Sequence, residues 1–356
     1  MNREFKKEHM RQLSEYRRKL QREPILKFLF LELTLRCNES CIHCGSRCGE
    51  FRSEELSFEH YKDFLNKIKH DFGTSGIQLC ITGGEPLLRK DFFDIMGYAH
   101  SLGFHWGMTS NGTLIDSNIA VKLKECGMDT ISVSLDGMRD SHDAFRRTPG
   151  GWDAAVRGIN ALIEQNAFRE IQVTTVIHKG NIDELNELYD YLCSVDIDSW
   201  RLVTIEPIGR ALDAGLSLDP DDYIRVLDFI REKRAENMPV TYGCTHYLGL
   251  EYEREVRDWY FLCNAGIYTA GIRSNGDIGA CLDIEMRPEL LEGNILTDDF
   301  TQIWENGFKS YRKDLSNRSS KCSACSEREF CHGGSFHSWD FDKNEQRACL
   351  KGVLFE

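Results

Sequence analysis

The sequence lacks any apolar run long enough to cross a membrane. Spanning a bilayer takes roughly 20 apolar residues, and the best stretch, residues 25–35, is interrupted by Lys27 and Glu32 and is typical of a buried strand. The N-terminus is charged throughout, so the apolar core of a secretory signal is also missing. We therefore expect a cytoplasmic protein without a membrane span.

Basic charge is in deficit as well. The formal net charge of −13 argues against a general nucleic-acid binder, which needs a basic face to neutralise phosphates. Cysteine, by contrast, is abundant: the chain has 14. In a reducing compartment such a density indicates metal or cluster binding more often than disulfides. A chain of 356 residues is long enough for a barrel-sized domain plus a smaller one.

Strand-like and helix-like segments alternate from residue 28 to about 235. Strands are expected at 28–35, 77–82, 104–109, 130–135, 171–177 and 200–205, and helices near 57–70, 90–102, 115–126, 152–165, 182–194 and 221–235. Such repeats predict parallel strands covered by helices, either a doubly wound sheet or an incomplete β/α barrel. The candidate site residues follow the strands, and barrel enzymes place their chemistry at that edge. We therefore predict an α/β fold, a partial (β/α)6 TIM-like barrel.

Two further segments flank this region, so the predicted domains are 1–27, 28–235 and 236–356. The first 27 residues carry nine Lys/Arg against four Glu, a net charge of +5, and their apolar residues roughly follow helical spacing. An amphipathic basic helix can bind a membrane or an acidic partner. We favour a helix packed on the outside of the barrel.

The spacing Cys37-x3-Cys41-x2-Cys44, just after the first strand, is the strongest chemical signal. Cysteine thiolates hold iron–sulfur clusters, and three on one loop can bind three irons of a cubane while the fourth stays open. A zinc knuckle or chance clustering is the alternative. The motif resembles the signature of the radical S-adenosylmethionine (radical SAM) enzymes, with His43 at the usually aromatic or bulky position. The resemblance implies a 4Fe–4S cluster that cleaves SAM to a 5′-deoxyadenosyl radical, which then abstracts a substrate hydrogen.

The ends of the later strands match the same family. Gly83-Gly84-Glu85-Pro86 resembles the GGEP element that binds the amino group of SAM. By the same resemblance, Arg146 pairs with the SAM carboxylate, although Arg147 is an equally charged neighbour. The other implied cofactor contacts are Ser110, Asn111, Ser134, Asp136, Thr175 or Asn181, and Pro207 in an adenine-side loop. Ordinary turns are the alternative at each of these strand ends.

The C-terminal third has its own cysteine pattern. Cys263, Gly276 and Cys281 are followed by Cys322-x2-Cys325-x5-Cys331 and then by Cys349. This resembles the SPASM extension, which binds auxiliary iron–sulfur clusters and occurs mainly in enzymes that modify peptides and proteins, such as the anaerobic sulfatase-maturating enzymes. The resemblance implies an outer cluster on Cys322, Cys325, Cys331 and Cys349, so at least one auxiliary cluster is expected.

One position departs from the SPASM pattern. Ser335 stands where a cysteine is expected, so the inner site keeps only Cys263 and Cys281. The inner cluster is then absent, is a two-iron form, or recruits Cys244 or His246. A structural zinc site that uses His332 is the rival interpretation of the outer cysteines.

The remaining cysteines fall outside these motifs. Cys80, Cys126 and Cys193 lie within strand or helix patterns, so we expect buried core thiols. Cys48 is expected to be a mobile loop thiol, because a fourth ligand to the cluster would block SAM.

The expected activity is the maturation of a peptide or protein by a cross-link, an oxidation or an epimerisation. The alternatives are radical modification of a small molecule or a tetrapyrrole side chain, and a non-catalytic cluster or zinc regulatory protein. Asp283, His337 and Asp340 lie near the auxiliary cysteines and are candidates for a proton-removing base. An electron donor such as flavodoxin or ferredoxin is expected, and no nucleic-acid partner.

Overall fold

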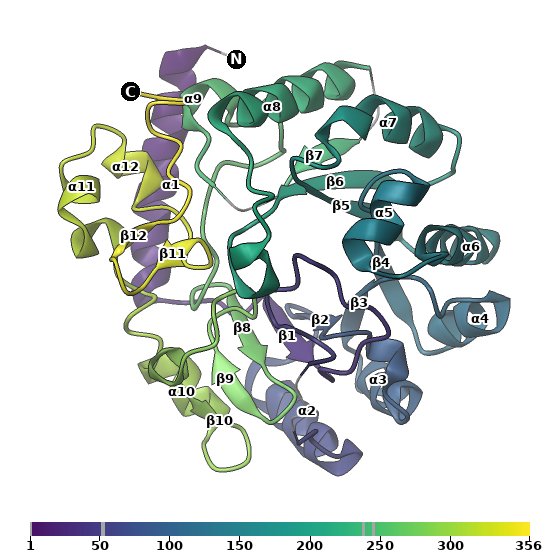
Figure 1. Ribbon diagram of the computed structural model, residues 1–356. Helices are drawn as coiled ribbons and strands as arrows, with labels where there is room; N and C mark the ends of the chain where they lie inside the picture. Colours follow the sequence, from purple (N-terminus) through teal and green to yellow (C-terminus); the bar gives the residue numbers. More distant parts are fainter. Residues whose placement is uncertain (1, 51–53, 237–238, 244–245) are drawn as a thin grey trace.

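The computed structural model describes residues 2–50, 54–236, 239–243 and 246–356 of the chain (Figure 1). The strands are β1 (Phe28–Glu32), β2 (Gln78–Thr82), β3 (His105–Ser110), β4 (Met128–Ser134), β5 (Glu170–Ile177), β6 (Ser199–Thr204), β7 (Val240–Tyr242), β8 (Thr269–Ile272), β9 (Asp277–Gly279), β10 (Gly293–Asn294), β11 (Trp339–Asp340) and β12 (Glu345–Gln346). The α-helices are α1 (Arg3–Arg22), α2 (Phe58–Phe72), α3 (Phe92–Ser101), α4 (Ser117–Glu125), α5 (Arg139–Arg146), α6 (Gly151–Glu164), α7 (Leu185–Cys193), α8 (Pro220–Ala235), α9 (Gly249–Tyr252), α10 (Phe300–Asn306), α11 (Ser320–Ser323) and α12 (Arg328–Cys331).

One large sheet organises the molecule, in the order β10-β9-β8-β1-β2-β3-β4-β5-β6-β7. Neighbours from β8 through β1 to β7 are parallel, whereas β9 and β10 are antiparallel. The predicted α/β class and its parallel sheet are confirmed. The parallel run does not stop near residue 236 as expected, because β7 and β8 continue it at opposite ends. The division at residues 235/236 stays a prediction.

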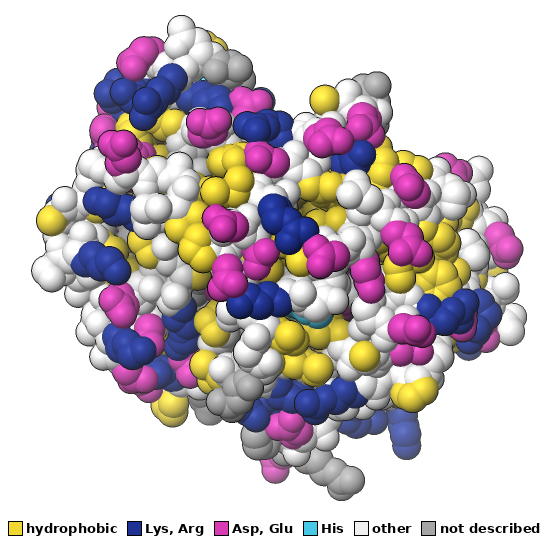
Figure 2. Space-filling view, turned by 45° about the horizontal axis from the view of Figure 1, so that its top comes forward, with side chains coloured by type: hydrophobic (Ala, Val, Ile, Leu, Met, Phe, Trp, Pro, Cys, Tyr) yellow, Lys and Arg dark blue, Asp and Glu magenta, His cyan; other side chains and the backbone are white. Residues whose placement is uncertain are grey.

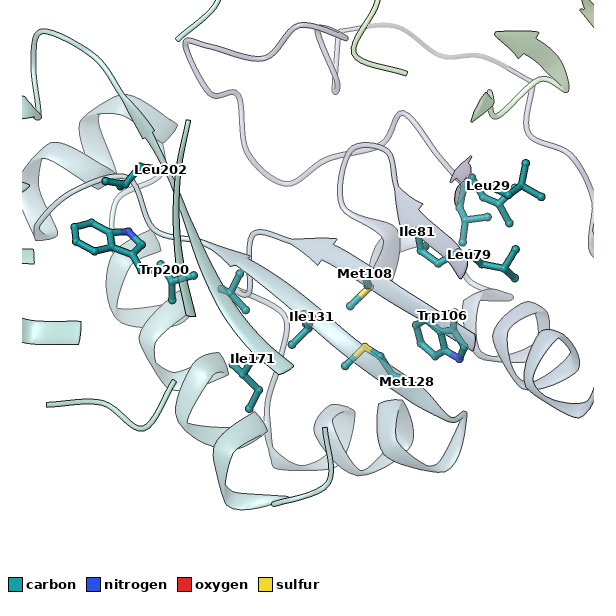
Figure 3. Packing of buried hydrophobic residues seen from close by; sticks show 14 of the residues in the cluster. Leu29, Leu79, Ile81, Trp106, Met108, Met128, Ile131, Ile171, Trp200 and Leu202 are labelled. Carbon is teal, nitrogen blue, oxygen red and sulfur yellow. The ribbon is translucent and has the colours of Figure 1, made fainter. Parts of the chain in front are cut away.

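The two faces of the strands differ in chemistry. Residues that alternate along β1 to β6 point outward and pack under the helices, among them Leu29, Ile81, Trp106, Ile131 and Trp200 (Figure 3). The intervening residues point inward. In β4 to β6 the inward residues are Thr130, Ser132, Ser134, Gln172, Thr174, Val176, Ser199, Arg201 and Val203, and all but the two valines can form hydrogen bonds. The interior of the curved sheet is therefore polar.

Helices α2, α3, α4, α6, α7 and α8 follow successive strands and line the outer face (Figure 1). Local signals set where they begin. Ser57 and His60 form a capping box at the start of α2, and Asp219 precedes Pro220 at the start of α8. Because the helices cover only the outside, the loops at the carboxyl ends of the strands remain free to build a site.

Helix α1 does not pack on the outside of the barrel, contrary to expectation. It lies against the C-terminal part of the chain, beside α9 and α12 (Figure 1). Met10 packs in an apolar cluster with Phe261 and Phe330, and Leu20 packs with Ile267. The buried face of α1 therefore joins the two ends of the chain.

Charged side chains of both signs lie on the surface (Figure 2), and Cys80, Cys126 and Cys193 lie outside the cysteine motifs. Acidic and basic side chains are interspersed on the face shown in Figure 2. None of the described helices is long and apolar enough to cross a membrane. Cys193 is exposed, and Cys80 and Cys126 are only half-buried. The expectation of buried core thiols was therefore wrong, most clearly for Cys193 at the end of α7.

Candidate active site

The glycine pair after β2 packs directly on the cysteine loop that follows β1. Gly84 N donates to Thr34 O at 2.8 Å, and Glu85 N donates to Arg36 O at 2.8 Å. A Cβ on Gly84 would lie 2.1 Å from Arg36 O, and one on Gly83, whose φ is +137°, would lie 2.3 Å from Thr34 O. Both positions therefore require glycine, because only a bare backbone can approach this closely.

Glu85 joins the end of β2 to the end of β3. It is fully buried, and its carboxylate accepts hydrogen bonds from Ser110 Oγ at 3.1 and 3.0 Å, from Asn111 N at 2.9 Å and from Leu87 N at 3.2 Å. Burial raises the pKa of Glu85 to about 7. Asn111 Nδ2 in turn donates to Asn38 Oδ1 in the cysteine loop at 2.9 Å. The structure thus brings these predicted residues together as the frame of the loop.

Arg146 lies between two carboxylates of the chain itself. Its NH1 donates to Glu39 Oε2 and its Nε to Asp136 Oδ2, both at 2.7 Å, and the residue is 5% exposed. Burial alone would raise the pKa of Asp136, but the charges of Arg146, His43 and His142 and a bond from Val176 N together outweigh it and lower that pKa. Arg147 is exposed, so the geometry selects Arg146. Both hydrogen bonds of Arg146 go to carboxylates of the protein, whereas the sequence predicted a bond to the carboxylate of SAM. The sequence analysis did not identify Glu39, because none of the motifs includes it.

The loop after β6 covers the cysteine loop from the other side. Arg210 Nε donates to Cys41 O at 2.7 Å, and a Cβ on Gly209 would lie 2.5 Å from Cys44 O. Pro207 lies half-buried two residues before Gly209. The predicted adenine-side loop therefore also supports the cysteines, through an arginine to which the sequence assigned no role.

The structure does not bring Thr175 to the site. Its Oγ1 donates to Leu135 O at 2.6 Å and accepts from Trp200 Nε1 at 2.9 Å, on the outward face of β5. Asn181, the alternative, donates from Nδ2 to Asp136 O at 3.1 Å and joins the ends of β4 and β5. Ser134 is half-buried on the inward face of β4.

The three cysteines lie on the loop that these contacts hold. Glu39 N donates to Cys37 Sγ at 3.4 Å, and Cys48 N donates to Cys44 Sγ at 3.3 Å. A bond from the Cys48 thiol is the largest cause that lowers the pKa of Cys44 to about 6. Cys48 is only 3% exposed, so it is not the loose loop thiol expected from the sequence. Cys41 is 8% exposed and its thiol lies 3.5 Å from Glu39 Oε2.

These residues fit a cluster held by three thiolates. All three sulfurs come from one loop, two of them accept backbone N–H groups, and Glu39 Oε1 is buried without a hydrogen-bond partner among the described residues. Across the described chain, no three His, Cys, Asp or Glu side chains converge as the ligands of a single metal ion would. A cubane instead takes one thiolate at each iron.

His43 begins a stack of three rings beside the cysteines. Its ring lies 4.7 Å from that of Phe145, which lies 4.0 Å from that of His178, with nearly parallel planes. Burial lowers the pKa of His43 to about 4. The imidazole is therefore neutral at physiological pH and acts as a flat packing surface, in agreement with the aromatic or bulky position expected there.

Four C-terminal cysteines form a second group. Burial, together with the charges of Cys349, Cys322 and Cys325, raises the pKa of Cys331 to about 12. The four sulfurs therefore lie within electrostatic reach of one another, although Cys349 is 18 positions from Cys331 in the sequence. This donor set suits a cluster with four thiolates.

His332 is already bound on both sides of its ring. Its Nε2 lies 3.0 Å from Ser14 Oγ in α1, and its Nδ1 lies 3.4 Å from Asp314 Oδ2. A zinc ligand needs one ring nitrogen free for the metal. The arrangement thus disfavours the zinc interpretation that included His332.

Ser335 lies in a buried, hydrogen-bonded turn. It is 1% exposed, and its Oγ lies 2.7 Å from Ser338 Oγ and 3.4 Å from His337 Nε2. Gln346 Nε2 donates to Ser335 O at 2.8 Å and closes this turn. Of the other candidates for the inner cluster, Cys244 lies outside the described residues.

The candidate bases lie where the barrel meets the C-terminal region. Burial lowers the pKa of His337, while the charges of Glu206 and Asp283 oppose this and His246 lowers it further. Glu206 Oε1 lies 2.8 Å from His246 Nε2. Asp340 instead accepts from two backbone N–H groups of its own turn. His337 and Asp283 are therefore near each other and near Glu206 at the end of β6, whereas Asp340 caps a turn.

The fold and site define a class: an open α/β barrel whose carboxyl edge carries a three-cysteine loop, joined to a cysteine-rich C-terminal region. Residues 31–192 match the model of the radical SAM superfamily, and residues 263–326 match the SPASM iron–sulfur cluster-binding domain. The chain therefore belongs to the radical SAM enzymes with a SPASM domain. Its cofactors are a SAM-binding 4Fe–4S cluster, S-adenosylmethionine and at least one auxiliary iron–sulfur cluster.

Relatives and solved structures agree with this family. The chain is 28% identical to the AdoMet-dependent heme synthase of Methanosarcina barkeri, over 85% of this chain and 89% of the relative. It is 29% identical to the mycofactocin maturase MftC of Mycobacterium tuberculosis, over 85% and 76%. The crystal structure of Streptococcus suis SuiB bound to S-adenosylmethionine covers 92% of this chain and 77% of its own, with a TM-score of 0.75 and 17% identity. The structure of anSMEcpe with bound AdoMet covers 93% of each chain, with a TM-score of 0.69 and 19% identity.

Proposed function

We propose that this enzyme modifies a peptide or protein substrate after translation, by a cross-link, an oxidation or an epimerisation. The polar interior of β4 to β6 is the observation that carries the proposal, because a peptide backbone brings amide groups that need hydrogen-bond partners once they are out of water. The relative named mycofactocin maturase supports the same class of substrate. When bound, the cluster and SAM supply the 5′-deoxyadenosyl radical that abstracts hydrogen.

In this proposal Cys37, Cys41 and Cys44 hold the SAM-binding cluster. The chain keeps their loop in place through backbone bonds to the glycine pair and through Arg146 and Arg210. The candidate SAM contacts stay those at the strand ends: Gly83, Gly84, Glu85, Ser110, Asn111, Ser134, Asp136, Arg146 and Pro207. Thr175 is left out because both of its hydrogen bonds are made on the outward face.

His337 is the proposed proton acceptor, with Asp283 as the alternative. A radical formed on the substrate loses a proton as well as an electron when the product is oxidised, so a neutral base near the barrel mouth is useful. Burial lowers the pKa of His337, which keeps the ring neutral and able to accept a proton at physiological pH. The electron donor is proposed to be a flavodoxin or a ferredoxin.

A tetrapyrrole substrate is the second candidate, because relatives named heme synthase and Fe-coproporphyrin III synthase match most of the chain. The test incubates reduced, anaerobic protein and SAM with Fe-coproporphyrin III or with peptides encoded near the gene. Product masses and 5′-deoxyadenosine are then measured. A mass change in a peptide supports the first candidate, and a mass change in the porphyrin supports the second. Unchanged 5′-deoxyadenosine formation after Cys37, Cys41 and Cys44 are all replaced by Ala would contradict both.

A further inference from the structure

A buried arginine from α1 reaches the auxiliary cysteines. Arg17 is 3% exposed, and its Nε has no hydrogen-bond partner in the part of the chain that the structure describes. The negative groups that act on it are, in order, Cys263, Asp314 and Cys331. The guanidinium therefore lies within electrostatic reach of Cys263 and Cys331, although it comes from the opposite end of the chain.

The geometry of α1 holds Arg17 in this place. Ser14, one turn earlier on the same helix face, donates to Glu329 O at 2.7 Å and lies 3.0 Å from His332 Nε2. Met10 and Leu20, each 1% exposed, anchor the helix on both sides. Arg17 consequently cannot swing out to solvent without undocking the helix.

A buried cation needs a compensating negative charge. Arginine stays protonated in proteins, and an unpaired charge out of water is costly. Asp314 offers one carboxylate, but that carboxylate already binds Ser316 N at 2.9 Å and faces His332 at 3.4 Å. A cluster with four thiolate ligands is anionic, and the potential of such a cluster depends on the charge and hydrogen bonds around it.

We propose that Arg17 is a positioning charge that favours the one-electron reduced form of the auxiliary cluster at Cys322, Cys325, Cys331 and Cys349. One electron taken up by the cluster adds one negative charge and breaks no bond. A fixed cation in a region of low dielectric stabilises that added charge and raises the reduction potential. The inference rests on the assignment of these four cysteines as ligands and is independent of the substrate.

The test measures the potential of the auxiliary cluster alone, in full-length protein whose Cys37, Cys41 and Cys44 are replaced by Ala. Anaerobic redox titration with dithionite is followed by electron paramagnetic resonance, and iron is counted in each sample. In this background Arg17→Gln is expected to reduce the equilibrium constant for reduction at least tenfold, a fall of 59 mV for one electron. Arg17→Lys keeps the charge and is expected to keep most of the potential. Arg18→Gln removes the same charge from an exposed neighbour and serves as the matched control.

Each result decides the inference. An unchanged potential in Arg17→Gln, or an equal fall in Arg18→Gln, overturns it. If Arg17→Gln does not retain iron, Arg17→Met is measured, because its side chain fills the apolar part of the site. Loss of iron from both variants also overturns the inference, since a charge that only sets the potential is not needed to hold the cluster. No cluster in the parent background would refute the ligand assignment, whereas failure of the peptide proposal would leave the potentials unchanged.

Discussion

Gly84 lies so close to the cysteine loop that a side chain has no space there. In Gly84→Ala the new Cβ would meet Arg36 O at 2.1 Å and Arg36 C at 2.7 Å, so backbone must move. We expect a loss of about 1–3 kcal/mol in the free energy of unfolding, together with loss of iron from the SAM-binding site. Gly76→Ala is the control, because nothing lies within 4 Å of its Cβ position. Chemical denaturation and iron analysis check both variants, and equal iron contents would contradict the expectation.

Glu85 makes stability depend on pH near neutrality. Burial raises its pKa from 4.5 to about 7, so the folded protein binds a proton that the unfolded chain has released. The stabilisation is complete below pH 4.5 and is lost as pH rises through 7; the upper limit is about 3 kcal/mol. Glu85→Gln removes this titration. The stability difference between wild type and Glu85→Gln should therefore shrink between pH 5 and pH 7.5 in denaturation experiments, and a constant difference would count against a raised pKa.

The sequence predicted which residues lie at the site better than it predicted which residues they form hydrogen bonds with. Glu85 and Asn111 come just after strands, and Arg146 ends the helix α5 that follows β4, so their place at the carboxyl edge could be predicted. Arg146 binds Glu39 because the cysteine loop folds back over the strand ends, and no motif encodes that contact. Thr175 was misplaced because successive strand residues face opposite sides, so an error of one position moves a side chain to the other face.

At the scale of elements, α1 is expected to stabilise the C-terminal region rather than the barrel. Met10 is 1% exposed and packs with Tyr247, Leu250, Phe261 and Phe330. Met10→Ala should therefore lower the free energy of unfolding by about 2–5 kcal/mol, the usual range for a large-to-small change in a core. Phe5→Ala, on the same helix but 50% exposed, should change it by less than about 0.5 kcal/mol. Denaturation curves for both test this, and similar losses would show that α1 packs differently.

The long elements could be predicted and the short ones could not. Six strands and six helices came from alternating apolar patterns of five residues or more, and the structure contains each with small shifts at the ends. Strands β7 and β8 have three and four residues, too few to show a period. Helix α1 showed its amphipathic pattern, but a pattern gives the buried face and not the surface that covers it.

Across the whole molecule, the first and last parts of the chain build one unit around the auxiliary cysteines. Strand β8 pairs with β1, and α1 packs beside α12, so the C-terminal region contacts both the sheet and the N-terminal helix. A cluster bound there would lie where the sheet, the N-terminal helix and the C-terminal region meet. The pattern of cysteines predicts the ligands, but only the fold shows that Ser14 contacts His332 and that Arg17 lies within electrostatic reach of Cys263 and Cys331.

The expected number of iron–sulfur clusters depends on Ser335, which stands where the SPASM pattern has a cysteine. Serine stands here in place of a thiolate, so the inner site keeps only Cys263 and Cys281, and we expect one auxiliary cluster and about eight irons per chain. Cys331→Ala should lower this to about four, because it removes a buried ligand of the outer cluster where no SAM completes the fourth iron, whereas Cys193→Ala, which removes an exposed thiol from α7, should leave it unchanged. Iron and sulfide analysis with Mössbauer spectroscopy of anaerobically reconstituted protein distinguishes these cases. About twelve irons would mean that the inner site recruits other ligands despite the serine, and about four in the wild type would remove the outer cluster and with it the partner of Arg17.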